Sequence, residues 1–122
     1  MSDTYITSHK VNGLNESIEV VARDEPDGSG ACHKYEIVPA GCGAQVVFID
    51  FQKGPLLEAG VNGVSIESLL AVAEHRLLGF QSGPFACREN AVALTKLQEC
   101  MMWLHKRTRD RIARGVEGTN QK

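Results

Sequence analysis

The second half of the chain carries apolar residues at the three- and four-residue spacing of amphipathic helices. A first helix is predicted over residues 65–81, with Ser65 as its N-cap. Its apolar positions are Ile66, Leu69, Leu70, Ala73, Leu77 and Phe80. A second, longer helix is predicted over residues 84–114, because Pro84 suits a first helical turn and Gly115 suits a C-terminal cap. Its apolar positions are Cys87, Ala91, Leu94, Leu97, Met101 and Leu104.

The predicted second helix is too long for a small domain to cover. About thirty residues make roughly 45 Å of helix, in a chain of only 122 residues. We therefore expect this helix to pair with a second copy of the chain. Residues 115–122 follow it as a tail that we expect to be loose.

Residues 1–60 show the alternating, β-branched patterns of strands. Strands are predicted over residues 18–22, 33–38 and 45–51, and the short Gly- and Pro-containing turns between them favour antiparallel pairing. The run over residues 45–51 is nearly continuous in apolar residues, so we expect it to be a central strand. The predicted fold class is α+β: a small antiparallel sheet followed by two α-helices, the second long, within a single domain of residues 1–122.

The charge of the chain is small overall but unevenly distributed. The formal net charge is −2. Residues 1–60 hold nine acidic and four basic residues, whereas residues 61–122 hold six acidic and nine basic ones. A protein that binds DNA without sequence preference is usually more basic. The asymmetry favours a specific small anion, or the pairing of unlike halves.

The sequence gives no sign of a membrane segment, a secretion signal or a metal site. The first ten residues are polar, and no apolar run reaches the length of a membrane span. Four cysteines are present, and we expect them to be reduced, with Cys87 and Cys100 packed as small apolar residues. Cys32, His33 and Cys42 approach the spacing of zinc ligands but lack a fourth partner, so no metal is predicted.

The most informative stretch is the arginine-rich end of the second helix. Arg107, Arg111 and Arg114 lie on one face at helical spacing, with Arg109 beside them. These cations can simply offset the dipole at the helix C-terminus. Alternatively they bind an anion, and guanidinium groups suit phosphate because they bind it with two parallel hydrogen bonds. The sequence favours phosphate.

Further candidates surround the junction between the two helices. Phe80 and Phe85 flank the turn, and each is either a core residue or a platform on which a base stacks. Asn90 offers amide donors and an acceptor that suit a base edge or a ribose, or it is an ordinary surface residue. The secondary candidates are His75, Arg76, Arg88, Arg109 and Arg114.

Catalytic motifs are scarce. The sequence contains no Gly-x-Ser-x-Gly, no Walker phosphate loop and no dinucleotide-binding Gly-x-Gly-x-x-Gly. Binding without turnover therefore fits better, and no cofactor is predicted. Two alternatives stay open: a phosphodiesterase that uses His105 or His75, and a small nucleic-acid-binding module.

Several segments resemble those of one phage protein family. They are Phe85–Ala91, Ala93–Glu99, Met102–Leu104 and Lys106–Gly118, with Phe51-Gln52-x-Gly54-Pro55 and Gly60–Val64 upstream. Together they resemble the phage anti-Thoeris sponge proteins, whose helical part is similar to that of the phage anti-CBASS cyclic-nucleotide sponges. The resemblance spans residues 17–118.

This resemblance implies a fold, a ligand and a site. A member would bind the cyclic ADP-ribose isomer (glycocyclic ADP-ribose) that Thoeris TIR enzymes make, without cleaving it, in the cytoplasm of the infected bacterium. It would form homodimers, and in some cases homohexamers as trimers of dimers, with the ligand between protomers. Cyclic di- or trinucleotides are further candidate ligands, and neither DNA nor a membrane is a partner. By position, Phe80 would stack on adenine, Asn90 would make the amide contact, and Arg107 and Arg111 would bind phosphate.

Overall fold

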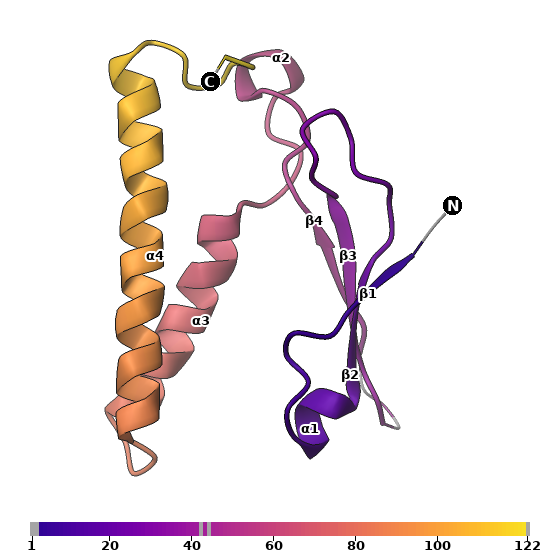
Figure 1. Ribbon diagram of the computed structural model, residues 1–122, viewed down its shortest axis with the longest axis vertical. Coiled ribbons are helices and arrows are strands. Elements are labelled where there is room, and N and C mark those ends of the chain that lie inside the picture. Colours follow the sequence, from indigo (N-terminus) through magenta and orange to yellow (C-terminus); the bar gives the residue numbers. More distant parts are fainter. Residues whose placement is uncertain (1–2, 42, 44, 122) are drawn as a thin grey trace. The chain divides into compact units, whose positions relative to one another are not determined.

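A computed structural model of the chain describes residues 3–121 apart from 42 and 44, so the expectations for Cys42 lie outside the described residues. The chain divides into two units, Met1–Lys53 and Gly54–Lys122. The first holds a four-stranded antiparallel sheet and the second is helical (Figure 1). The predicted α+β class, with an antiparallel sheet before the helices, is thereby confirmed. That the units form a single domain stays a prediction.

The sheet has its strands in sequence order. The strands are β1 (Thr4–Ile6), β2 (Ile18–Ala22), β3 (Lys34–Pro39) and β4 (Val47–Asp50), and a short helix α1 (Gly13–Glu16) precedes β2. β2 pairs with both β1 and β3, and it contains Val21 and Ala22, which are the buried apolar residues of the described chain. The pattern predicted β2 with its observed bounds.

The prediction that residues 45–51 form a central strand is wrong. β4 lies at one end of the strand order and pairs only with β3. Its side chains are largely exposed, and Phe48 retains 70% of its accessible surface. A continuous apolar run is typical of a strand that is covered on both faces, but nothing in the described sheet unit supplies that cover.

The helical unit begins with a short helix α2 (Leu56–Ala59) and continues with α3 (Ile66–Gln81). Ser65 caps α3: its side chain accepts a hydrogen bond from the Ser68 amide, and the Ser68 side chain accepts one from the Ser65 amide. This reciprocal pair satisfies two backbone donors at the start of the helix. The predicted first helix and its N-cap are therefore confirmed.

Helix α4 (Arg88–Ala113) starts later than predicted, at Arg88 rather than near Pro84. The cause is the side chain of Gln81, whose amide oxygen accepts from the Cys87 nitrogen at 3.1 Å and whose amide nitrogen donates to the Cys87 oxygen at 3.2 Å. These bonds hold residues 82–87 as a turn. The Cys87 sulfur then caps α4 by accepting from the Asn90 amide.

The predicted packing of two cysteine side chains is also wrong, because Cys87 and Cys100 are both exposed. Cys87 caps the helix instead of packing under it, and Cys100 lies on an outer face of α4. Partial cover follows a stripe of α4 that keeps the predicted Leu94, Leu97, Met101 and Leu104 but not Cys87 or Ala91. The partly covered residues are Asn90, Leu94, Leu97, Met101, Leu104, Thr108 and Arg111. Their alternating steps of four and three residues give the narrow seam of a two-helix contact.

Helices α3 and α4 run antiparallel and side by side (Figure 1). Neither helix contains a fully buried residue in the described chain, so the pair has contact but no core of its own. None of the helices among the described residues is long and apolar enough to cross a membrane.

The residues that follow α4 are held by hydrogen bonds and do not form the loose tail that the sequence predicts. Gly115 has φ 74°, a left-handed conformation that favours glycine. Its amide donates to the Ile112 carbonyl and the Val116 amide donates to the Arg111 carbonyl, both at 3.0 Å. This is a Schellman cap, and residues 116–121 (the C-terminal segment) continue from it toward α2 (Figure 1).

Candidate functional site

The structure places the four main candidates at two opposite ends of the helix pair. Phe80 ends α3 and Asn90 begins α4, so these two lie near the turn. Arg107 and Arg111 lie at the far end, where Arg107 faces Glu67 in the first turn of α3. Asn90 and Arg107 are separated by about 25 Å along α4 at 1.5 Å per residue. A single chain therefore keeps the two pairs of candidate residues at opposite ends of the helix pair.

At the turn end, Phe80 is flanked by a cation and by a second aromatic ring. The Arg76 guanidinium carbon lies 4.9 Å from the Phe80 ring centroid, within the range of a cation–π contact. Phe85 packs edge-on, with centroids 6.4 Å apart and an interplanar angle of 84°. Phe80 is only partly covered, whereas Phe85 is 72% exposed. The aromatic candidate is thus accessible, and a positive charge is beside it.

The neighbouring polar candidates differ in how well they are placed. Asn90 is partly covered, and the Cys87 cap fixes its backbone in the first turn of α4. His75 and Arg88 are exposed. The Gln81 bonds to Cys87 fix the turn that joins Phe80 to Asn90. Sequence reasoning missed this role of Gln81, which nothing in the periodic pattern indicates.

At the arginine end, Arg107 is largely exposed but not isolated. Its Nη2 lies 3.6 Å from a carboxylate oxygen of Glu67, and 57% of the Arg107 side chain is accessible. A contact of this length between exposed groups is weak. The Arg107 guanidinium is therefore available to an anion. Without one, its contact with Glu67 directs it toward α3.

Arg111 is engaged far more strongly, because its guanidinium binds the C-terminal segment. Nε donates to the Glu117 carboxylate at 2.9 Å, and Nη2 donates to the carbonyls of Val116 at 2.8 Å and Thr119 at 3.0 Å. Nη1 donates to the Gln121 carbonyl. Only 19% of the side chain remains exposed. The sequence did not reveal these contacts, because the tail was expected to be loose.

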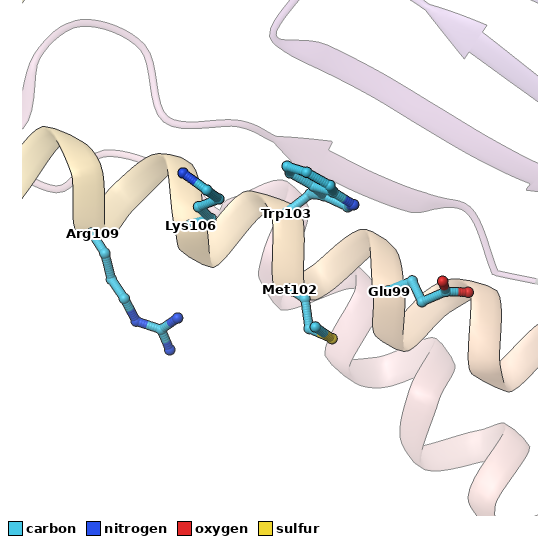
Figure 2. A pocket seen from close by; sticks show the side chains of 5 residues that line it. All are labelled: Glu99, Met102, Trp103, Lys106 and Arg109. Carbon is cyan, nitrogen blue, oxygen red and sulfur yellow. The ribbon is translucent and has the colours of Figure 1, made fainter.

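The remaining cations of the cluster point elsewhere. Arg109 lines an open hollow of about 410 Å³ on α4, together with Glu99, Met102, Trp103 and Lys106 (Figure 2). None of the four main candidates lines this hollow. Arg114 is exposed at the C-cap of α4. The arginines predicted to share one face thus have different partners: Arg107 contacts Glu67, and Arg111 binds the C-terminal segment.

In the sheet unit, a loop between β2 and β3 is organised by two carboxylates. Burial raises the pKa of Asp24, but hydrogen bonds from the amides of His33 and Lys34 outweigh it and leave the pKa lowered. The side-chain and backbone hydrogen bonds of Ser29, and then the 2.6 Å contact with His33, hold the pKa of Asp27 well below its usual range. Sequence reasoning identified the loop but not these bonds.

The sheet unit offers little for nucleophilic or metal chemistry. Burial raises the pKa of the Cys32 thiol, with the carboxylate of Asp24 adding to the shift. A raised thiol pKa disfavours the reactive thiolate. Across residues 3–121 without 42 and 44, no three His, Cys, Asp or Glu side chains are grouped so that they could hold a metal ion.

Comparison with known proteins identifies the helical part. Residues 43–109 match the model of the Acb2/Tad1 hairpin domain. The chain is also 55% identical, over 74 residues, to "Thoeris anti-defense 1" of Bacillus phage SBSphiJ7. That alignment covers 61% of this chain and 52% of the relative, so the chain matches about half the length of that protein. The matched region includes β4, α3, α4 as far as Arg109 and three of the four main candidates, Phe80, Asn90 and Arg107.

Proposed function

This chain belongs to the Acb2/Tad1 hairpin-domain family, and from that premise we propose that it is a phage anti-defence protein that sequesters a nucleotide signal. The ligand is a cyclic ADP-ribose isomer made by bacterial Thoeris enzymes, bound without cleavage in the cytoplasm of the infected cell. The observation that carries this proposal is the family match over the two helices, together with an aromatic ring, an amide and cations at their ends.

The chemistry of the side chains suits such a ligand. A cyclic ADP-ribose isomer offers a purine face and a pyrophosphate. Stacking a base on an aromatic ring contributes about 1–3 kcal/mol, and each hydrogen bond to a charged group contributes about 1.5–3 kcal/mol. One stack on Phe80, two arginine contacts and the Asn90 amide together contribute about 5–10 kcal/mol before the cost of association, and a preorganised site reduces that cost on the way to the roughly 12 kcal/mol of a nanomolar complex.

We propose that the binding form is at least a homodimer, because one chain keeps the two pairs of candidate residues at opposite ends of the helix pair. Asn90 and Arg107 are about 25 Å apart along α4, which is too far for one small ligand to contact both. An antiparallel copy brings the arginine end of one chain level with the Phe80 and Asn90 end of the other. The absence of buried residues in α3 and α4 of the described chain also favours an additional packing partner.

The outer face of α4 is suited to such self-association. Met102 is 67% exposed and Trp103 is 71% exposed, and both lie in the hollow described above (Figure 2). A two-fold axis between these two residues places Glu99 of one chain opposite Lys106 of the partner subunit, and the reverse. Unlike charges then flank an apolar centre on both sides, which is the self-complementarity that a two-fold interface requires. We propose this face as one contact between copies.

A calorimetric titration against a panel of ligands tests the proposed specificity. The panel contains the 2′- and 3′-linked glycocyclic ADP-ribose isomers, linear ADP-ribose, a cyclic dinucleotide and a cyclic trinucleotide, and random duplex DNA. We expect roughly nanomolar binding of at least one cyclic ADP-ribose isomer. Salt-sensitive binding to DNA, with none to the isomers, would instead favour a nucleic-acid-binding module. If the chain binds only a cyclic oligonucleotide, the proposal that it sequesters a signal stands, but the proposed ligand is wrong.

A further inference from the structure

The guanidinium of Arg111 already has the hydrogen bonds that a phosphate would need. An arginine has five N–H donors, and four of those of Arg111 donate to Glu117, Val116, Thr119 and Gln121. A guanidinium binds an oxyanion in two parallel bonds along either of two edges, Nε with Nη2 or Nη1 with Nη2. Both edges are occupied by oxygen atoms of the C-terminal segment. One Nη1 hydrogen remains.

The C-terminal segment is held in this arrangement by its own structure. The Gly115 cap ends α4 and directs the chain toward α2. The Thr119 amide and hydroxyl both donate to the Val116 carbonyl, at 3.1 and 2.5 Å, and the Gln121 amide donates to the Thr119 hydroxyl at 3.2 Å. These local bonds set the carbonyls in positions where they converge on Arg111.

A second anchor joins the segment to α2. The Leu57 amide donates to the Gly118 carbonyl at 3.0 Å. Gly118 has φ 82°, and a Cβ there would lie 2.9 Å from Cγ of Leu57. A side chain larger than hydrogen therefore does not fit at this position without a shift. The hydrogen bond and the close approach between Gly118 and Leu57 therefore attach the segment to α2, independently of Arg111.

Given the proposed function, on which this inference rests, we infer that the C-terminal segment competes with the ligand's phosphate for Arg111. The Glu117 carboxylate and the three carbonyls take the positions of phosphate oxygens. A phosphate can then bind with two hydrogen bonds only when the segment leaves Arg111. Glu117 is the charged member of the set, so it is the side chain that competes most directly with an anion for Arg111.

The competition weakens every ligand that needs Arg111, by the inverse of the fraction of chains in which the segment is released. If the segment is released in one chain of ten, the apparent affinity falls about tenfold. An anion that makes only phosphate contacts is then bound poorly. A ligand that also stacks on Phe80 and bonds to Asn90 makes further contacts and binds despite the competition. The segment thus lowers the occupancy of Arg111 by weakly bound small anions, whereas a ligand that binds far more tightly still saturates the site.

The test compares the full chain with a chain that ends at Gly115 and with the variant Glu117→Gln. Glu58→Gln is the matched control, since Glu58 is an exposed carboxylate of the same unit on α2. Inorganic pyrophosphate and glycocyclic ADP-ribose are the probes in calorimetry. We expect pyrophosphate to bind about tenfold more tightly to the shortened chain and about threefold more tightly to Glu117→Gln. Glu58→Gln should match the full chain.

Amide hydrogen exchange gives a second measurement on the intact chain. Saturating pyrophosphate should speed exchange at Thr119 and Gln121, because their amide bonds belong to the displaced segment. Equal or weaker pyrophosphate binding by both the shortened chain and Glu117→Gln would overturn the inference. If the shortened chain does not fold, Glu117→Gln and the exchange measurement decide.

The outcomes separate this inference from the proposed function. Tight binding of glycocyclic ADP-ribose that is unchanged in both variants keeps the proposed function and rejects the competition. Tighter pyrophosphate binding by the variants, with no binding of the cyclic ligand by any form, keeps the competition and rejects the proposed ligand. Failure of every form to bind either probe rejects both.

Discussion

Arg76 lies over Phe80, with its guanidinium carbon 4.9 Å from the ring centroid. The two residues are one turn apart on α3, so their side chains lie on the same face of the helix. The positive charge therefore sits on the ring that is proposed to stack on adenine. A base that stacks on Phe80 meets both an aromatic surface and a nearby cation, which suits a nucleotide better than an uncharged aromatic compound.

Replacing Phe80 by leucine should weaken binding of the cyclic ADP-ribose isomer by about tenfold, because the stack is lost while apolar volume is kept. Leucine is preferred to alanine, since Phe80 also packs against Phe85. Calorimetry measures the affinity and the thermal midpoint reports folding. Phe85→Leu, at a residue that is 72% exposed, should lose much less affinity. Equal losses in both variants would contradict the assignment of the stack to Phe80.

Arg107→Ala should weaken binding of the cyclic ADP-ribose isomer by about tenfold or more, because a hydrogen bond to a charged group is lost. The thermal midpoint should not change, because the Arg107 side chain is largely exposed and its contact with Glu67 is long. The loss should shrink as salt is raised. Lys34→Ala is the control, since Lys34 is an exposed cation whose partner is Asp50 in the sheet unit. Affinity unchanged by Arg107→Ala would remove this residue from the site.

The proposed contact between copies is tested by exchanging its charges. Glu99→Lys places like charges opposite each other across the two-fold axis, and so does Lys106→Glu. Each should shift the mass measured by analytical ultracentrifugation toward the monomer. The double variant restores opposite charges and should recover the assembly. Single variants that assemble like the original chain would show that α4 does not pair through this face.

The loop of the sheet unit should lose stability in acid. The pKa of Asp27 is lowered in the folded chain by Ser29 and His33, so its contribution is present in full above the unfolded value of about 4 and declines as the pH falls below it. Denaturation followed from pH 7 to pH 2 should show a steeper acid loss for the original chain than for Asp27→Asn. Asp50→Asn, at an exposed aspartate paired with Lys34, should keep the original pH profile. Identical profiles for Asp27→Asn and the original chain would contradict this role.

The sequence predicted well those helices and strands whose bounds depend on neighbouring residues. Ser65 and the apolar spacing after it define α3, and both are properties of neighbouring residues. Residues 84–87 resemble the start of a helix, yet the Gln81 side chain holds them as a turn. The apolar run of β4 predicts a central strand, yet β4 lies at one end of the strand order. Periodicity reports the apolar character of a strand and not its position in the sheet.

The candidate site shows the same division. The helical spacing of Arg107 and Arg111 placed both on the last turns of α4, and the structure agrees. That Arg111 binds the C-terminal segment could not be predicted, because carbonyl groups are present in every residue and only the fold makes them converge. Likewise the contact of Arg107 with Glu67 depends on the antiparallel packing of α3 and α4.

Capture and release of the signal tests the central claim most directly. The purified chain is incubated with glycocyclic ADP-ribose, separated from free ligand, denatured by heat and analysed by mass spectrometry of the released small molecules. Sequestration without cleavage predicts stoichiometric release of the intact cyclic nucleotide, which then activates a Thoeris effector again. Release of a linear or hydrolysed product would contradict it and would identify an enzyme, with His75 and His105 the first residues to replace.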